Sequence, residues 1–176
     1  LPDSVYQACL KQMKSLGLVA GAFDFKARVD FVKVPSVIKL RNGEYTSLSA
    51  HIDITCTLDM RRSMIEQAAI HFRPDYFIVD KEARGLRHEL DPTLTRLKQM
   101  GCRNILGLRD VLDEDEVVEE EWRKNDVIGC IDGFYDGIWV YGSADFHNPI
   151  GGIALPAQLR DRVRYTGYLA RTVPQV

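Results

Sequence analysis

The sequence has no long apolar run and no paired cysteines. No stretch approaches the roughly 20 apolar residues that a transmembrane helix needs, and no signal-peptide core opens the chain. Cys9, Cys56, Cys102 and Cys130 form no CxxC pair, and no histidine stands at metal-ligand spacing from them. Isolated cysteines in such a chain favour reduced thiols over a disulfide or zinc site. We therefore expect a cytoplasmic protein without a metal or cofactor.

The sequence also lacks a basic excess and the common nucleotide and hydrolase motifs. It has 23 Lys and Arg against 25 Asp and Glu, a formal net charge of −2. This balance disfavours a general nucleic-acid binder. GxGxxG, GxxxxGK[ST], GxSxG and HExxH are all absent, which argues against dinucleotide-binding, P-loop, α/β-hydrolase and zinc-protease functions.

What the sequence does have is a regular alternation of helix-like and strand-like segments. At this spacing, the alternation predicts parallel β-α-β units with helices on both sides of the sheet. We expect a Rossmann-like, three-layer α/β/α fold with a mostly parallel sheet. The expected helices cover 4–16, 57–72, a short segment between Asp91 and Gly101, 113–125, 127–134 and 156–162, and the expected strands cover 18–22, 30–34, 76–80, 104–108, 137–141 and 163–166.

The segment "DYFIVDKEARGLRHEL" (75–90) changes abruptly from apolar to charged. Tyr76–Val79 has the composition of a strand buried on both faces, and Asp80 begins a charged loop. In parallel sheets, ligands bind beyond the carboxyl ends of the strands, so this change predicts the exit of a central strand into a ligand-binding crevice. Two later strands end similarly, at Arg109-Asp110 and at Tyr141 to Asp145.

Five segments in a fixed order resemble a known family. They are "DFVKVPSVIKLRNGEY" (30–45), "FRPDYFIVDKEARGLRHEL" (72–90), "ILGLRDVLD" (105–113), "YDGIWVYG" (135–142) and "RVRYTGYL" (162–169). Together they resemble bacterial predicted glycosyltransferases of the two-lobed GT-B architecture, related to the enzyme that adds N-acetylglucosamine to the lipid-linked peptidoglycan precursor. The resemblance covers roughly residues 21–171.

The resemblance implies that residues 1–168 form the N-terminal lobe, which receives a sugar or lipid-linked acceptor. Residues 169–176 would begin the linker to a C-terminal lobe, outside this chain, that holds the nucleotide-sugar donor. Family members open with a strand and a Gly-rich turn ending in His, whereas residues 1–17 here have a helical pattern. We therefore expect a fragment that does not transfer sugar alone. Relatives that use lipid-linked acceptors carry an apolar patch on this lobe, which implies peripheral membrane contact.

Inverting glycosyl transfer needs a base for the acceptor hydroxyl and charges that stabilise the leaving diphosphate. Asp80 and Glu82 are candidates for the base. Gly85 suggests a positive φ or the close approach of a ligand. The alternative is a structural loop, in which Asp80 caps a turn and the other charges form exposed pairs of little energy. The candidates for holding a phosphate-bearing acceptor are Lys81, Arg84 and Arg87.

The later strand exits supply further candidates for substrate binding. Arg109 and Asp110 either contact a ligand or form an internal salt bridge that fixes their loop. Tyr141 suits stacking on a sugar face, although a tyrosine at a strand end is more often part of the core, and Asp145 follows it. The turn signal Asn42-Gly43 predicts either a plain surface hairpin or a flap over the cleft.

A second hypothesis assigns the same strand edge to another class of protein. It is a non-catalytic, doubly wound α/β module that binds a small phosphorylated ligand or a protein partner. An NAD-dependent enzyme is a weaker third hypothesis, because the glycine fingerprint is missing.

Overall fold

The computed structural model describes residues 32–41, 44–49, 51–112 and 115–168. Except for residues 32 and 33, these belong to one compact unit, Val34–Val176. The helix expected at 4–16 and the strand expected at 18–22 lie outside the described residues. The elements, in order, are β1 (Val37–Lys39), β2 (Tyr45–Ser47), α2 (Ile54–Phe72), β3 (Tyr76–Asp80), the 3₁₀ turn η1 (Leu86–His88), α3 (Asp91–Gln99), β4 (Arg103–Arg109), α4 (Asp115–Lys124), α5 (Val127–Phe134), β5 (Gly137–Tyr141), α6 (Ala157–Arg160) and β6 (Val163–Tyr165).

The main sheet has four strands in the order β3-β4-β5-β6, and all three pairings are parallel. Val79 pairs with Leu106, Leu106 with Ile138, and Ile138 with Val163, so one row of aliphatic residues crosses the sheet. The prediction of a parallel α/β sheet is confirmed, and the expected bounds of these strands are correct to within one residue.

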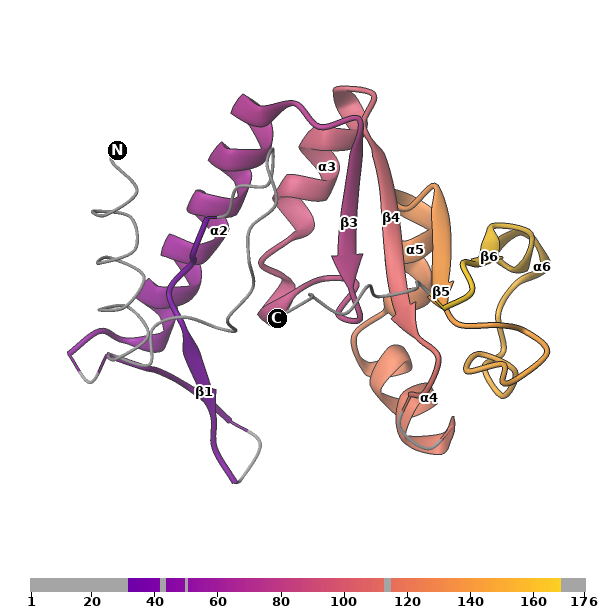
Figure 1. The fold of residues 1–176 in the computed structure, drawn as a ribbon. Coiled ribbons are helices and arrows are strands. Elements are labelled where there is room, and N and C mark those ends of the chain that lie inside the picture. Colours follow the sequence, from indigo (N-terminus) through magenta and orange to yellow (C-terminus); the bar gives the residue numbers. More distant parts are fainter. Residues whose placement is uncertain (1–31, 42–43, 50, 113–114, 169–176) are drawn as a thin grey trace, which may run out of the picture. The chain divides into compact units, whose positions relative to one another are not determined.

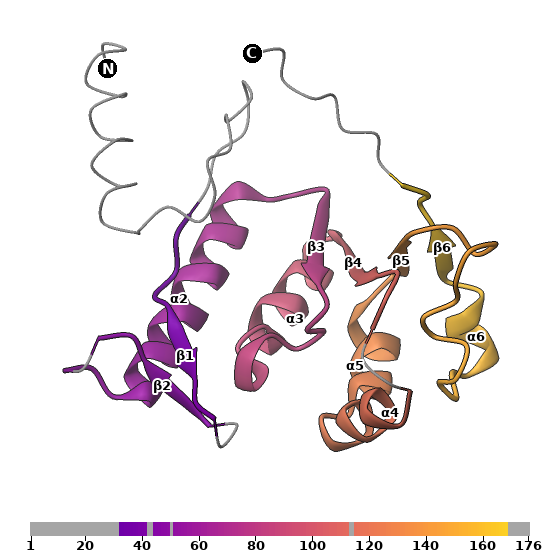
Figure 2. The same cartoon turned by 60° about the horizontal axis from the view of Figure 1, so that its bottom comes forward.

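The described helices lie together on one side of this sheet (Figures 1 and 2). Successive parallel strands joined by right-handed crossovers put their helices on the same face when the strand order advances in one direction. The order β3-β4-β5-β6 contains no reversal. A second helical layer is not among the described elements, so the three-layer arrangement stays a prediction.

The core fills the space between the sheet and this helical layer. Leu106 and Leu108 of β4 and Ile138 of β5 are almost completely buried against Leu94 of α3 and Ile131 of α5. Each helix contributes side chains at helical spacing, while each strand contributes every second residue.

β3 is the edge strand of the sheet among the described elements, and only one of its faces is buried. Val79 points into the core, whereas Tyr76 and Ile78 are 50% and 47% exposed and Asp80 is exposed. The prediction of a central strand buried on both faces is therefore wrong for this part of the chain. The apolar run concealed the alternation, because both faces of β3 carry large apolar side chains.

Helix α2 begins three residues before its predicted start. The carboxylate of Asp53 caps it by accepting a hydrogen bond of 2.7 Å from the Thr55 amide. On this helix Met60 and Phe72 are exposed, whereas Ala69 is buried. Helix α2 packs on α3, where Ala69 lies in one cluster with Leu97. This contact leaves some apolar side chains of α2 exposed to solvent.

Residues 37–47 form the antiparallel hairpin β1-β2. The Leu40 amide donates to Glu44 O at 2.7 Å, next to the predicted turn at 42–43, which lies outside the described residues. The hairpin prediction is confirmed. The strand expected at 30–34 is not formed over its described residues, 32–34.

Asn104 connects three elements from the buried side of β4. Its Nδ2 donates to Leu94 O in α3 (3.3 Å) and to Phe134 O at the end of α5 (3.0 Å), and the residue is fully buried. We expect Asn104→Ala to lower the free energy of unfolding by about 2–4 kcal/mol, since it removes both bonds and leaves a small cavity.

Urea unfolding followed by circular dichroism measures this change. Asn125→Ala is the matched control, because the Asn125 side chain makes no hydrogen bond among the described residues and should change stability by less than about 0.5 kcal/mol. Equal losses in the two variants would contradict the role given to Asn104.

Candidate functional site

A pocket of about 830 Å³ lies beyond the carboxyl ends of β3 and β4. Its walls come from the loop 81–88 after β3, from helix α4 and from the hairpin β1-β2. Apolar side chains include Leu108, Leu112, Val118, Trp122 and Val127. Polar and charged side chains include Glu44, Lys81, Glu82, Arg84, Arg87, His88, Glu121 and Lys124.

The loop 81–88 holds an unusual number of residues in left-handed conformations. Lys81, Arg87 and His88 have φ values of 64°, 46° and 65°, and Gly85 has a φ of 64°. Such conformations cost non-glycine residues on the order of 1–3 kcal/mol each, so surrounding contacts must hold them. At Gly85 a Cβ atom would lie 2.7 Å from Leu90 Cγ. The positive φ predicted at Gly85 is therefore confirmed, and the neighbour that excludes a Cβ atom is the protein itself.

A buried ion pair fixes one end of this loop. Arg61 of α2 donates through Nε and Nη2 to the two carboxylate oxygens of Glu89, both at 2.6 Å. Glu89 also accepts from the Leu86 amide (3.3 Å), and Arg61 donates to Pro35 O (2.7 Å). Because Glu89 is 3% exposed, this bidentate pair links α2 and the pocket loop with little competition from water, and Arg61 also holds the segment that precedes β1.

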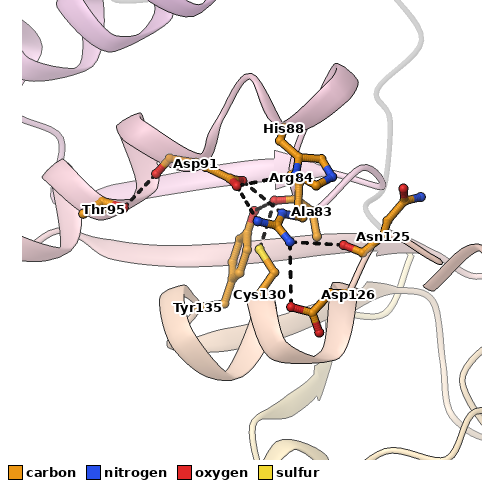
Figure 3. A network of polar contacts seen from close by, with 9 residues as sticks. All are labelled: Ala83, Arg84, His88, Asp91, Thr95, Asn125, Asp126, Cys130 and Tyr135. Carbon is orange, nitrogen blue, oxygen red and sulfur yellow. Dashed lines mark hydrogen bonds and ion pairs between the residues drawn. The ribbon is translucent and has the colours of Figure 1, made fainter. Parts of the chain in front are cut away.

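A second network, drawn in Figure 3, holds Arg84. Its Nε donates to Asp91 Oδ1 at 3.1 Å, its Nη2 donates to Asp91 Oδ2, and its Nη1 donates to Asn125 O at 3.2 Å. The hydrogen bond to Asp91 raises the pKa of Arg84 above its ordinary value. Arg84 was a candidate for holding phosphate, but the structure assigns these donors to the protein itself. Asp91 is the first residue of α3 and binds this guanidinium.

The carbonyl of Ala83 anchors the middle of the loop to α5 and its end. It accepts a hydrogen bond from the Tyr135 hydroxyl and one from Cys130 Sγ at 3.8 Å (Figure 3). Burial raises the pKa of the Cys130 thiol to about 11 and raises the pKa of Tyr135 as well. Cys130 is therefore a protonated structural thiol and is unsuited to nucleophilic catalysis.

Five of the ten candidate site residues line the pocket together: Lys81, Glu82, Arg84, Gly85 and Arg87. Glu82 and Arg87 are exposed. Among the described residues, the Arg87 guanidinium forms no ion pair or hydrogen bond. The pocket therefore brings together a carboxylate and a guanidinium from one short loop.

Asp80, Arg109 and Tyr141 lie on the other side of the sheet, away from the helical layer. Arg109 Nη2 is 3.5 Å from Asp80 Oδ2, and both side chains are more than half exposed. The phenol of Tyr141 crosses over Gly107, where a Cβ atom would lie 1.9 Å from its hydroxyl. Burial and, secondarily, Asp80 raise the pKa of Tyr141. The predicted salt bridge of Arg109 is thus formed with Asp80, and Asp80 does not line the pocket.

Asp110 and Asp145 lie further along the carboxyl edge. Asp110 Oδ2 accepts a hydrogen bond of 2.9 Å from the hydroxyl of Tyr168, which follows β6. Asp145 belongs to the exposed turn after β5, where its amide donates to Ser143 Oγ at 3.4 Å. Neither residue lines the pocket of loop 81–88.

Several residues that shape the site were not predicted from the sequence. Val118 and Trp122 stand four residues apart on α4, a spacing that indicates core packing as readily as a pocket wall. Arg61 and Glu89 are 28 residues apart and belong to no sequence motif. Only the fold brings them together.

Comparison with protein-family models, curated proteins and solved structures found no significant match to this chain. Within the described residues there is no group of three or more His, Cys, Asp or Glu side chains placed to hold a metal ion. In the same part of the chain, every helix is too short or too polar to cross a membrane.

The bidentate pair predicts a specific stability pattern. Glu89→Leu should lower the free energy of unfolding by about 3–5 kcal/mol, because it leaves the guanidinium of Arg61 buried without a charged partner. The double variant Arg61→Leu/Glu89→Leu should lose much less than the sum of the two single variants. A double-mutant cycle from urea unfolding gives the coupling, and strictly additive losses would contradict a shared buried pair.

Proposed function

We propose that this chain is the acceptor-binding lobe of a nucleotide-sugar-dependent glycosyltransferase. The observation that carries the proposal is the pocket at the carboxyl ends of β3 and β4, with Glu82 and Arg87 on its wall. Glu82 would accept the proton of an acceptor hydroxyl, while Arg87 and Lys81 would bind a phosphate on the acceptor or the leaving group. The donor would be held by a second lobe, as in the GT-B proteins that the sequence resembles.

The pocket has the form that such a reaction requires. Apolar side chains of β4 and α4 make one part of its wall, and charged side chains of loop 81–88 make another. Ligand sites are commonly concave, apolar in most of their lining and equipped with a few fixed polar groups. The networks of Arg61 and Arg84 fix the loop backbone, so the charged groups are positioned before a ligand arrives.

We also propose that the sheet belongs to a Rossmann-like, three-layer domain. All-parallel sheets are nearly always covered on both faces. The face away from the described helices carries Tyr76, Ile78 and Trp139, with the rings of Tyr76 and Trp139 6.4 Å apart. A second layer over this face would remove these large side chains from water.

Peripheral membrane contact is part of the same proposal, for a lipid-linked acceptor. Hairpin β1-β2 and the residues around it expose Ile38, Leu40, Leu48 and Ile52, with Lys39 and Arg41 nearby in the sequence. Apolar side chains flanked by cations favour the interface of an anionic membrane.

A second candidate is a non-catalytic module that binds a small phosphorylated ligand through Arg87. It is favoured by the exposed guanidinium of Arg87, which has no partner among the described residues. In this case, Arg87→Ala would abolish binding of the phosphorylated ligand, and no sugar would be transferred.

Glu82 provides the direct test of glycosyl transfer. The protein encoded by the complete gene is incubated with a uridine diphosphate hexose or N-acetylhexosamine and a lipid-linked saccharide, and release of uridine diphosphate is measured. We expect Glu82→Gln to lower turnover by roughly 100-fold or more, because it removes the proposed base. Glu116→Gln, an exposed carboxylate of α4 that does not line the pocket, is the control.

Two results would contradict the assignment. Undiminished turnover in Glu82→Gln would remove Glu82 from the chemistry. Absence of any uridine diphosphate release from the wild-type protein, together with tight binding of a phosphorylated ligand, would favour the non-catalytic module.

Tryptophan fluorescence tests the second layer. Trp122→Phe leaves Trp139 as the reporter on the uncovered face. In the complete protein, we expect blue-shifted emission and weak quenching by acrylamide, since a covering layer excludes water and the quencher. Emission and quenching like those of free N-acetyltryptophanamide would show that this face is open to solvent.

A further inference from the structure

The carboxyl ends of β4, β5 and β6 converge at a second site, separate from the lining of the large pocket. Asp110 follows β4, Phe146 lies in the turn after β5, and Tyr168 follows β6. Tyr168 donates to Asp110 Oδ2 at 2.9 Å, and the rings of Phe146 and Tyr168 lie 6.5 Å apart at an interplanar angle of 79°. We define these three residues as the aromatic rim.

Two glycines bring the three strand ends close together. A Cβ atom on Gly142 would lie 2.6 Å from Asp110 Cβ, so no larger residue fits there without moving Asp110. Gly167 has a φ of +68°, and its amide donates to Gly142 O at 2.9 Å. This left-handed step, which suits glycine, directs the chain to Tyr168. Backbone geometry thus builds the rim from residues far apart in sequence.

The aromatic side chains of the rim face solvent. Phe146 is 77% exposed and Tyr168 is 60% exposed, although the two rings contact each other edge to face. The hydrogen bond to Asp110 raises the pKa of Tyr168, so its hydroxyl stays protonated and remains the donor to the carboxylate. The Asp110 side chain is therefore oriented, and its Oδ1 makes no hydrogen bond among the described residues.

An exposed ring beside an oriented carboxylate has the chemistry of a sugar site. The C–H face of a pyranose is apolar and packs on an aromatic ring, while its hydroxyl groups donate to carboxylate oxygens. Asp110 and Asp145 both disfavour an anionic ligand at this place. A neutral saccharide fits both features.

We propose that the aromatic rim binds a neutral pyranose, with the ring of Phe146 under the sugar and Asp110 accepting from its hydroxyl groups. This inference rests on the proposed function in one respect, since it identifies the bound sugar as part of the acceptor. Tyr168 is a positioning residue, which orients Asp110 and supports Phe146.

Direct binding tests the rim without requiring turnover. Methyl β-D-glucopyranoside and methyl N-acetyl-β-D-glucosaminide are titrated to about 50 mM, a range suited to millimolar dissociation constants. Binding is followed by amide chemical shifts and by saturation transfer to the sugar protons. We expect shifts at residues 110, 142–146 and 167–168, with strongest transfer to the protons of one sugar face.

Phe146→Ala should weaken binding of the better sugar by about tenfold or more, because the stacking surface is removed. Phe72→Ala is the matched control, since Phe72 is 82% exposed on α2 and lies outside the rim, and it should leave the dissociation constant unchanged. Asp110→Asn should weaken binding, because it removes the charge that accepts from the sugar hydroxyls. The protons of the same sugar face should still receive the strongest saturation transfer, since Phe146 is unchanged.

Failure to detect either sugar at the rim, or equal losses in Phe146→Ala and Phe72→Ala, would overturn the proposal. Uridine diphosphate release with no sugar bound at the rim would also overturn it while leaving the glycosyltransferase proposal intact. Sugar binding at the rim, together with no transfer by the protein encoded by the complete gene, would support the site and contradict the proposed function.

Discussion

Parallel pairing of β3, β4, β5 and β6 is the constraint on which the rest of the structure depends. Because all four strands run in one direction, their carboxyl ends share one edge, and every loop that follows a strand opens there. The row from Val79 to Val163 keeps the strands in register, so the strand ends are level. Pocket and aromatic rim lie along this edge because of the pairing and not because of any local motif.

Loop 81–88 shows how the fold supports an unfavourable local conformation. Lys81, Arg87 and His88 occupy left-handed conformations that an isolated peptide would leave. Short, charge-assisted bonds at Glu89 and Arg84 compensate, since they anchor the loop to α2 and to the segments around α3 and α5. The carbonyl of Ala83 is fixed independently by Tyr135. The loop therefore has a defined shape although it carries many charges.

The sequence predicted the four strands of the main sheet well, because their aliphatic runs end at clear polar boundaries. It did not predict which face each polar residue would occupy. Asp80 is still in β3, where successive side chains point to opposite faces, whereas Glu82 has left the strand and lines the pocket. Asp80 and Glu82 were therefore predicted to share one site, but they lie on opposite faces of the sheet and only Glu82 lines the pocket. Likewise, the bond between Arg84 and Asp91 depends on a tertiary turn that no residue spacing encodes.

The balance of charged and apolar side chains around the pair Asp80–Arg109 gives a final physical reason to regard the sheet face of Tyr76, Ile78 and Trp139 as an interface. In the described part of the chain both charged side chains are more than half exposed, where an ion pair contributes little to stability. A second layer over this face would remove apolar surface from water, which stabilises a protein by about 25 cal/mol for each Å² buried. It would also desolvate the pair, a cost that a single contact of 3.5 Å offsets only in part. The apolar side chains of this sheet face therefore favour its burial, whereas the guanidinium of Arg87, which has no partner among the described residues, suits contact with a ligand at the pocket.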